Sequence, residues 1–384
     1  MFYTRFFHRN SLACFLVLGF VIGFSQTLKA QFTITKEDHV IEIGAAFTNY
    51  YNYRFYADDE TNFRKNRFRL KDAQLKIDGR HYHDFSYELQ ADFSGLALSE
   101  YDGENPFLMD AWVSYTGLPV DIKVGYQKVP FSRNSMVPFR RMPFFQRAEM
   151  NRGDVYYRRD LGVTLSRSMW RQRLRVYAGA YTGLGETGLA GDNDPSGKLE
   201  YVFRTDLSYP TRFRYREMDL NVSPLPMFSV GLNGRYTDKN VTAGSRYQLL
   251  NVDGEKYTYG ADASFQYMGL NVQLEWLQIM AYPNQPTLLY NAETDFFRAG
   301  GYMAQASYFI KPIKSVFAVR YDELNPHDLI VGNTRKTISF AYNFLINGDD
   351  NLIRLQYWHR LEEEQTGLPW SEDQIRIGWV FNLY

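Results

Sequence analysis

The residues best suited to chemistry are a cluster of arginines in the N-terminal half of the chain. Between Ser132 and Arg152 there are five arginines, and Glu149 is the single acid. A guanidinium group is planar, always charged, and able to bind two oxygens of an anion at once. The cluster therefore predicts a surface that contacts anions, formed by Arg133, Arg140, Arg141, Arg147 and Arg152.

The segment that carries these arginines, residues 130–158, has no regular period, although alternating stretches precede it at 120–127 and follow it at 161–166. Its three prolines exclude a strand or a long helix. Aromatic and methionine side chains are interleaved with the arginines, and disordered loops are seldom so apolar. We expect residues 130–158 to pack inside a barrel as a constriction loop. The side chains concerned are Pro130, Pro138, Pro143, Phe139, Met142, Phe144, Phe145 and Met150.

Residues 1–30 have the pattern of a secretory signal peptide. Arg5 and Arg9 precede an apolar run at 12–24, and cleavage is expected before Gln31. The alternative is an uncleaved anchor, but the apolar run is short for a helix that spans a bilayer. Cys14 lies within this segment, so residues 31–384 contain no cysteine. This absence excludes disulfides and thiolate chemistry in the mature chain.

The composition of the chain is balanced in charge and rich in aromatic residues. There are 43 Lys and Arg against 43 Asp and Glu, which gives no basic field for nucleic acid. Aromatic residues make up 17% of the chain, and no later apolar run approaches the length of a membrane helix. An exported, aromatic-rich chain of this kind fits an outer-membrane barrel, whose strands are apolar on alternate residues only.

Alternation of apolar and polar residues recurs along the chain and is clearest at 85–93. In the second stretch the phase slips at Asp72, which predicts a β-bulge. The expected strands number about 16. Their ranges are 40–54, 68–77, 85–93, 109–115, 120–126, 161–166, 174–181, 201–209, 228–236, 257–267, 270–276, 301–308, 316–321, 337–344, 352–357 and 375–384.

The connections between these stretches are sorted by length. Short turns follow most even-numbered strands and long loops follow the odd-numbered ones, with the link at 210–226 as the exception. A membrane barrel has short periplasmic turns and longer external loops, whereas a soluble sandwich has no reason for such sorting. We predict an all-β fold, a transmembrane antiparallel β-barrel in the outer membrane of a Gram-negative bacterium.

Several stretches resemble the phosphate-selective porin O and P family, in the order in which that family has them. The resemblance implies a sixteen-stranded barrel whose third external loop folds into the lumen, and anion passage along basic lumen residues. It leaves the oligomeric state open, with a homotrimer as one candidate. The stretches are Arg67 to Ile77, Asp110 to Tyr115, Gly125 to Ser132, Arg159 to Val163 and Gly179 to Gly183.

The polar faces of the strands should line the lumen. The second strand offers Arg67, Arg69 and Lys71, and the fifth offers Lys123 with Lys128 beyond it. With the loop arginines they predict a pathway for small anions, with phosphate as a candidate, because basic rings favour anions in pores. The alternative is an ordinary salt-bridged wall, for which acids are present at Glu88, Asp92, Asp110, Asp121, Asp262 and Glu275.

Other motifs carry little weight. Residues 183–188 match GxGxxG but open no helix. Residues 192–197 resemble half of a calcium loop that lacks its final glutamate. His81 and His83 have no evident third ligand. We therefore predict no metal, no cofactor and no enzyme, and a porin in contact with outer-membrane lipid. The competing hypothesis is a non-conducting barrel that serves as a binding, adhesion or structural protein through its external loops.

Overall fold

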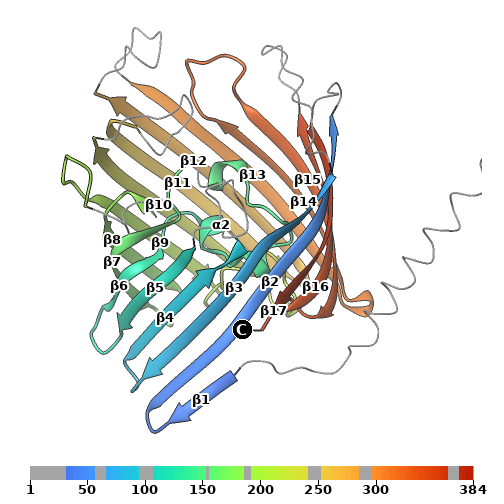
Figure 1. Ribbon diagram of the computed structural model, residues 1–384, viewed down its shortest axis with the longest axis horizontal. Coiled ribbons are helices and arrows are strands. Elements are labelled where there is room, and N and C mark those ends of the chain that lie inside the picture. The colour runs from blue at the N-terminus through green and yellow to red at the C-terminus, as the bar shows by residue number, and fades with distance from the viewer. Residues whose placement is uncertain are drawn as a thin grey trace, which may run out of the picture.

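The computed structural model describes residues 32–56, 66–94, 107–152, 155–185, 192–240, 252–284, 296–361 and 372–383. Seventeen strands form one sheet there, and β2 to β17 close into a sixteen-stranded barrel because β17 pairs with β2 and β9 pairs with β10 (Figure 1). The strands are β1 (Phe32–Lys36), β2 (His39–Tyr56), β3 (Asn66–His81), β4 (Phe85–Asp92), β5 (Leu108–Tyr115), β6 (Asp121–Lys128), β7 (Arg159–Met169), β8 (Leu174–Tyr181), β9 (Glu200–Tyr209), β10 (Met227–Lys239), β11 (Gly254–Tyr267), β12 (Leu270–Pro283), β13 (Phe297–Ile310), β14 (Ser315–Asn325), β15 (Arg335–Asn347), β16 (Asn351–Leu361) and β17 (Glu372–Asn382).

Each of the sixteen ranges predicted from alternation corresponds to one of the strands β2 to β17, so the predicted antiparallel barrel is confirmed. The short strand β1 was not predicted. It pairs with the first residues of β2, where the pairing of β17 with β2 has already ended at Ala46. All five of its residues are exposed, so it carries no burial pattern that a sequence could reveal.

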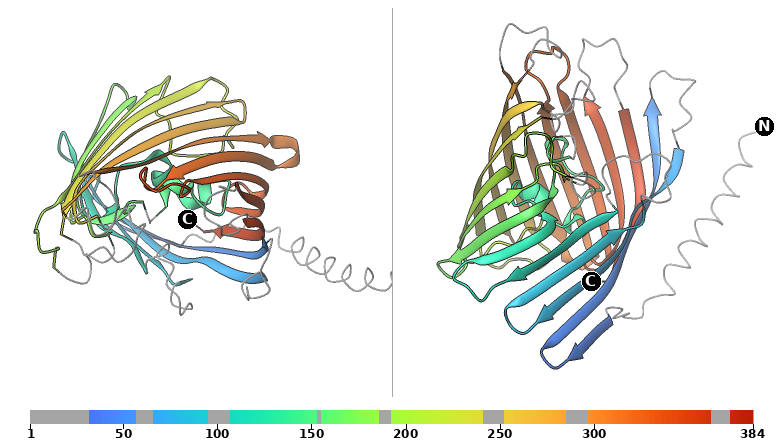
Figure 2. Two further views of the ribbon diagram at one scale, coloured as in Figure 1. Left: turned by 90° about the horizontal axis from the view of Figure 1, so that it is seen from above. Right: turned by 60° about the vertical axis from the view of Figure 1, so that its left-hand side comes forward.

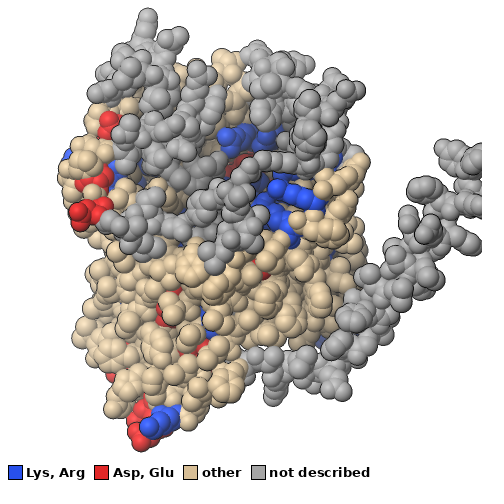
Figure 3. Space-filling view, in the orientation of Figure 1, with Lys and Arg blue, Asp and Glu red and all other residues tan. Residues whose placement is uncertain are grey.

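The two faces of the wall differ as the alternation requires. In β11, Tyr257 and Tyr259 are 41% and 40% exposed on the outside, whereas Thr258 and Asp262 are 3% and 4% exposed on the inside. In Figure 3 charged atoms are sparse across the middle of the wall and gather toward its two rims. An apolar outer wall around a polar interior is the arrangement that a membrane-spanning barrel needs.

The bulge predicted at Asp72 is confirmed. The register between β2 and β3 shifts between Thr48 and Asn49, which lie opposite Asp72 and Leu70. The extra residue lets Lys71 and Asp72, 8% and 5% exposed, both point into the barrel. The bulge thus keeps Asp72 inward, whereas strict alternation from Arg69 and Lys71 would have turned it toward lipid.

The connections at one end of the barrel are tight turns, such as residues 268–269 between β11 and β12 and residues 348–350 between β15 and β16. We call this end the short-turn rim. The link at 210–226 joins β9 to β10 at the same end but is far longer. No helix within the described ranges has the length and apolarity needed to cross a membrane.

Candidate functional site

The arginine-rich segment between β6 and β7, called the insert here, crosses the interior of the barrel. It contains α2 (Arg133–Met136), η2 (Phe139–Arg141) and η3 (Glu149–Asn151). Ser132 caps α2, because its side chain accepts a hydrogen bond from the backbone N–H of Ser135. Seen from above in Figure 2, α2 lies inside the ring of strands.

Four arginines of the wall donate to backbone carbonyls of the insert. Arg204 of β9 donates to Phe131 O at 2.5 Å and Arg235 of β10 to Tyr157 O at 2.9 Å. Arg320 of β14 donates to Gln146 O at 3.0 Å and Arg354 of β16 to Phe144 O at 2.8 Å. We call these the wall arginines. They fix the path of the insert through its backbone, independently of most of its side chains.

Three of the wall arginines are neutralised by acids of the wall itself. Arg204 pairs with Asp206 at 2.6 Å, Arg235 with Glu200 at 2.6 Å, and Arg320 with Asp322 at 3.1 Å. Arg354 instead donates to the side-chain oxygen of Asn343 at 2.6 Å. Buried charges need such partners, because their desolvation is otherwise uncompensated.

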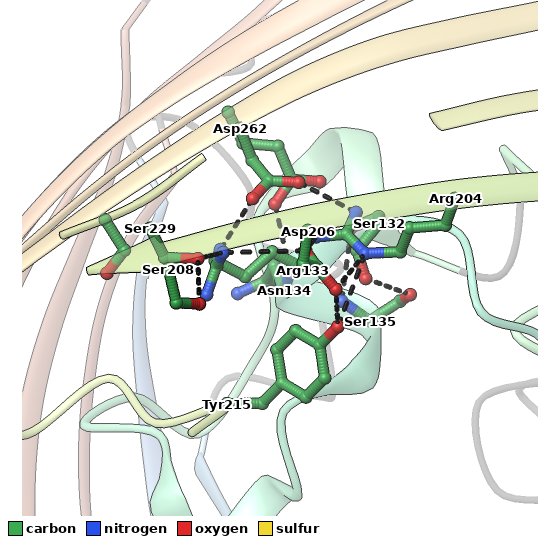
Figure 4. Close-up of polar contacts among 12 residues, drawn as sticks. Ser132, Arg133, Asn134, Ser135, Arg204, Asp206, Ser208, Tyr215, Ser229 and Asp262 are labelled. Carbon is green, nitrogen blue, oxygen red and sulfur yellow. Dashed lines mark hydrogen bonds and ion pairs between the residues drawn. The ribbon is translucent and has the colours of Figure 1, made fainter. Parts of the chain in front are cut away.

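Arg133 joins this buried network instead of an open passage. Its Nε lies 2.6 Å from Asp262 Oδ1, and Asp262 Oδ2 lies 2.8 Å from Arg204 Nη1 (Figure 4). The side chains of Arg133 and Asp262 are 1% and 0% exposed. Tyr215 donates a short hydrogen bond to Asp206 on the same side. Arg133 therefore anchors α2 to β9 and β11.

Apolar contacts hold the rest of the insert against the C-terminal strands. Phe144 is fully buried with Ala318 and Ala341, inward residues small enough to leave room for a phenyl ring. Phe145 packs in a second cluster with inward-facing aliphatic residues of β14 to β17. These apolar positions interrupt the polar inner face where the insert covers it. Its phenylalanines thus account for these contacts of the insert with the wall. The second cluster contains Tyr50, Met218, Val316, Leu345, Leu352 and Val380.

The opposite side of the insert borders an open space, which we call the main cavity, of about 290 Å³ against β2 to β7. Nine basic residues and three acids line it. The acids each have a partner: Asp110 pairs with Arg159 at 2.9 Å, Glu88 with Lys76 at 3.1 Å, and Asp72 accepts from Gln74 at 3.2 Å. The basic residues are Lys71, Lys76, Lys123, Lys128, Arg140, Arg147, Arg152, Arg158 and Arg159.

A second space of about 200 Å³, the outer cavity, lies between the insert and β2, β3, β16 and β17. It shares Lys71, Gln146 and Arg152 with the main cavity, so the two spaces are adjacent. No acid lines it among the described residues. Its other basic residues are Arg54, Arg69, Arg360 and Arg376.

The structure brings most of the predicted site residues to these cavities. Lys71, Lys123, Lys128, Arg140, Arg147 and Arg152 line the main cavity, and Arg69 lines the outer one. Arg67, Arg133 and Arg141 line neither. Sequence reasoning missed Arg54 and Arg376, although both lie on predicted strands, and it missed Arg158, Arg159 and Arg360. Arg158 and Arg159 could have been found by extending the arginine cluster to the start of β7.

Arg147 both supports the backbone of the insert and borders the main cavity. It is 8% exposed and donates to the carbonyls of Asn134 and Val137, yet it also lines the main cavity. Burial, together with the nearby charge of Arg158, lowers the pKa of the Arg147 guanidinium to about 9. The group is therefore still mainly positive at neutral pH. No group of three His, Cys, Asp or Glu side chains suited to a metal ion occurs in the described ranges.

A closed antiparallel barrel with an apolar outer wall, a polar lumen and an internal passage is the architecture of a porin-type channel. Three solved structures share the fold. An anion-selective porin from Comamonas acidovorans has a TM-score of 0.60 at 11% identity, with 90% of this chain and 99% of that chain covered. The DcaP channel of Acinetobacter baumannii has a TM-score of 0.58 at 11% identity, with 91% and 98% covered. OmpT of Vibrio cholerae, in a trimer form, has a TM-score of 0.57 at 8% identity, with 90% and 100% covered.

The family model described as phosphate-selective porin O and P matches residues 43–382, and the chain belongs to that family. This confirms the resemblance found in the sequence. Family and fold indicate an outer-membrane channel, and they point to a channel rather than an enzyme. No curated protein matches the chain in sequence.

Proposed function

We propose that the protein is a passive porin that prefers small anions, with phosphate as the candidate solute. The observation that carries the proposal is the lining of the main cavity, where nine Lys and Arg face three acids and each acid already has a partner. Rings of Lys and Arg favour anions in pores. The gradient of the solute drives its passage.

The proposed pathway excludes the wall arginines, because wall acids or Asn343 already engage their guanidinium groups. Selectivity would come from the lysines of β3 and β6 and from the arginines on the free side of the insert. Lys123 lies over the Trp112 ring at 4.1 Å, a contact that holds its ammonium near the cavity. The fork of Arg69, which lines the outer cavity, suits the paired oxygens of phosphate, whereas Arg152 already pairs with Glu149 at 2.9 Å.

The test is the reversal potential of refolded protein in a planar bilayer under a KCl gradient. We expect the wild type to prefer chloride. In the double variant Lys123→Glu/Lys128→Glu the cavity would hold seven basic residues against five acids, so most of the preference should disappear. Lys311→Glu, in an exposed turn of the short-turn rim, is the matched control and should keep the wild-type potential.

A cation-preferring wild type would refute the proposed selectivity. Block of the chloride current by added phosphate would support phosphate as a solute, and an unaffected current would argue for a general anion porin. Folded protein without any conductance would favour the alternative, a binding or structural barrel.

Two further proposals concern the mature protein. We propose that it is a homotrimer, as the trimer form of OmpT from Vibrio cholerae suggests for the fold. Light scattering of the protein in detergent would give the mass of one or of three chains. We also propose that residues 1–30, which lie outside the described residues, are removed on export, and N-terminal sequencing of the membrane-inserted protein tests this.

A further inference from the structure

The long link between β9 and β10, residues 210–226, departs from the other turns of the short-turn rim. Four of its side chains are almost fully buried: Phe213 (1% exposed), Glu217 (0%), Met218 (2%) and Asp219 (3%). A turn that only joined two strands at the rim would leave such side chains in solvent. The link therefore folds into the barrel from the short-turn side.

Glu217 fastens the link to both the wall and the insert. Its Oε2 accepts from Gln305 of β13 at 2.9 Å, and its Oε1 accepts from Asn134 of α2 at 2.6 Å. Its backbone carbonyl accepts from Ser307 at 2.6 Å, and Met218 packs in the same apolar cluster as Phe145. The link and the insert thus meet inside the lumen and support each other.

A backbone contact brings the arginines of the two segments together. The N–H of Glu217 donates to the carbonyl of Arg141 at 3.3 Å, so Arg216 lies beside η2, which carries Arg140 and Arg141. Burial lowers the pKa of the Arg141 guanidinium, and the positive charges of Arg140, Arg216 and Arg214 lower it further. Such coupling requires the four groups to lie near one another.

The acids that face this group are few. Asp349 of the β15–β16 turn lies 3.7 Å from Arg141, and Asp350 is its neighbour. Within the described part of the chain, Arg214 and Arg216 form no ion pair, and Arg214 is exposed. The four arginines therefore outnumber the two acids around Arg141, beside the turn between β15 and β16.

We propose that Arg214 and Arg216, together with Arg140 and Arg141, form a second anion site at the short-turn mouth of the channel. Arg140 also lines the main cavity, so the site is continuous with the passage. Its ligands are small solute anions, with multivalent oxyanions such as phosphate favoured by the several guanidinium groups. The inference rests on the proposed function for its solute class, but the link that supplies Arg214 and Arg216 is separate from the insert.

A charged site at one mouth concentrates anions on one side only, and salt screens it, since the Debye length falls from about 10 Å at 0.1 M to about 3 Å at 1 M salt. The experiment compares single-channel currents at both polarities, with protein added from one side of a phosphatidylcholine bilayer. That lipid carries no net charge, so any anion held at the site comes from the solution. Wild-type currents should be asymmetric in about 0.1 M KCl or potassium phosphate and nearly symmetric in about 1 M KCl.

In the double variant Arg214→Gln/Arg216→Gln we expect the larger of the two low-salt currents to fall about twofold to fivefold, while currents in about 1 M KCl stay unchanged. Lys311→Gln is the matched control, because Lys311 lies in the exposed turn between β13 and β14 on the same rim. Arg214→Lys/Arg216→Lys should retain the asymmetry. Because the lysine variant keeps both positive charges, it distinguishes loss of charge from damage to the link.

Low-salt currents of the double Gln variant equal to the wild type would overturn the proposal, as would an equal loss in Lys311→Gln. The wild-type reversal potential distinguishes this outcome from failure of the proposed function. An anion-preferring wild type with no effect of Arg214 and Arg216 removes the second site alone. A wild type without anion preference whose asymmetry still depends on these arginines removes the general anion preference and leaves the mouth site in place.

Discussion

Replacing Asp262 with asparagine tests the buried network that anchors the insert. The two carboxylate oxygens of Asp262 lie 2.6 Å from Arg133 Nε and 2.8 Å from Arg204 Nη1, and all three side chains are at most 1% exposed. Asparagine has the same shape and keeps one acceptor oxygen. It removes the negative charge that both guanidinium groups share and turns an amide donor toward one of them.

The size of the effect follows from the partners that remain. Arg204 keeps Asp206 at 2.6 Å, but the nearest other acid to Arg133 is Asp206 at 3.8 Å. Removing one partner of a buried ion pair typically costs about 3–5 kcal/mol, because the other charge stays buried without compensation. We expect Asp262→Asn to lower the free energy of unfolding by an amount near the lower end of that range, since the asparagine keeps one acceptor oxygen and Arg133 still donates to Ser229 at 2.6 Å.

The assay is urea unfolding of the refolded barrel in detergent, followed by tryptophan fluorescence, with single-channel recording of the same preparation. The control is Asp78→Asn. Asp78 also pairs with a basic residue, Lys76 at 3.0 Å, but it is 33% exposed, and such pairs contribute about 1 kcal/mol or less. Because α2 would be less firmly held, we also expect open-channel noise to rise in Asp262→Asn and not in the control.

An Asp262→Asn protein as stable as the Asp78→Asn control, with a quiet open channel, would refute the assignment of Arg133 as an anchor. The arginine would then have to be neutralised or solvated in another way, and it would return to the list of candidates for the anion pathway.

Two more substitutions test the packing. Phe144→Ala should lower the free energy of unfolding by about 3–5 kcal/mol and raise the conductance, because the ring is fully buried on Ala318 and Ala341; a stable variant with unchanged conductance would contradict the packing of the insert against β14 and β15. Gly162→Ala should reduce the fraction of heat-resistant folded barrel on a gel, since its Cβ would lie 2.3 Å from the carbonyl oxygen of Ala180 and 2.5 Å from the Tyr181 ring; normal folding would show that β7 and β8 can separate to admit a methyl group.

The strands could be predicted from the sequence because the residues of each strand alternate with the environment that they face. An outer residue meets lipid and an inner residue meets water or polar groups, so the alternation in a range such as 85–93 is sufficient to locate a strand. Even the bulge at Asp72 changed the phase visibly. The strand β1 has no such alternation of exposed and buried residues, since all five of its residues are exposed.

Which arginines anchor the insert and which line the cavities could not be predicted, because each role depends on partners that are distant in the sequence. Arg133 and Asp262 are 129 residues apart in the chain, and nothing near Arg133 in the sequence identifies its partner. The link at 210–226 was recognised as an exception by its length. Its inward course depends on contacts of Glu217 with Asn134 and Gln305, which are 83 and 88 residues away.

The basic residues of the two halves of the barrel wall therefore have different roles. Strands β9 to β16 supply the wall arginines, whose guanidinium groups are occupied by acids, by Asn343 and by the backbone of the insert. Strands β3 to β7 supply cavity-lining lysines and Arg159, with fewer acids than basic groups. The insert covers the inner face of β9 to β16 and leaves that of β3 to β7 open. A solute therefore meets mainly the strands on which basic residues outnumber acids. Selectivity would then depend less on how many arginines the chain has than on which of them the insert covers.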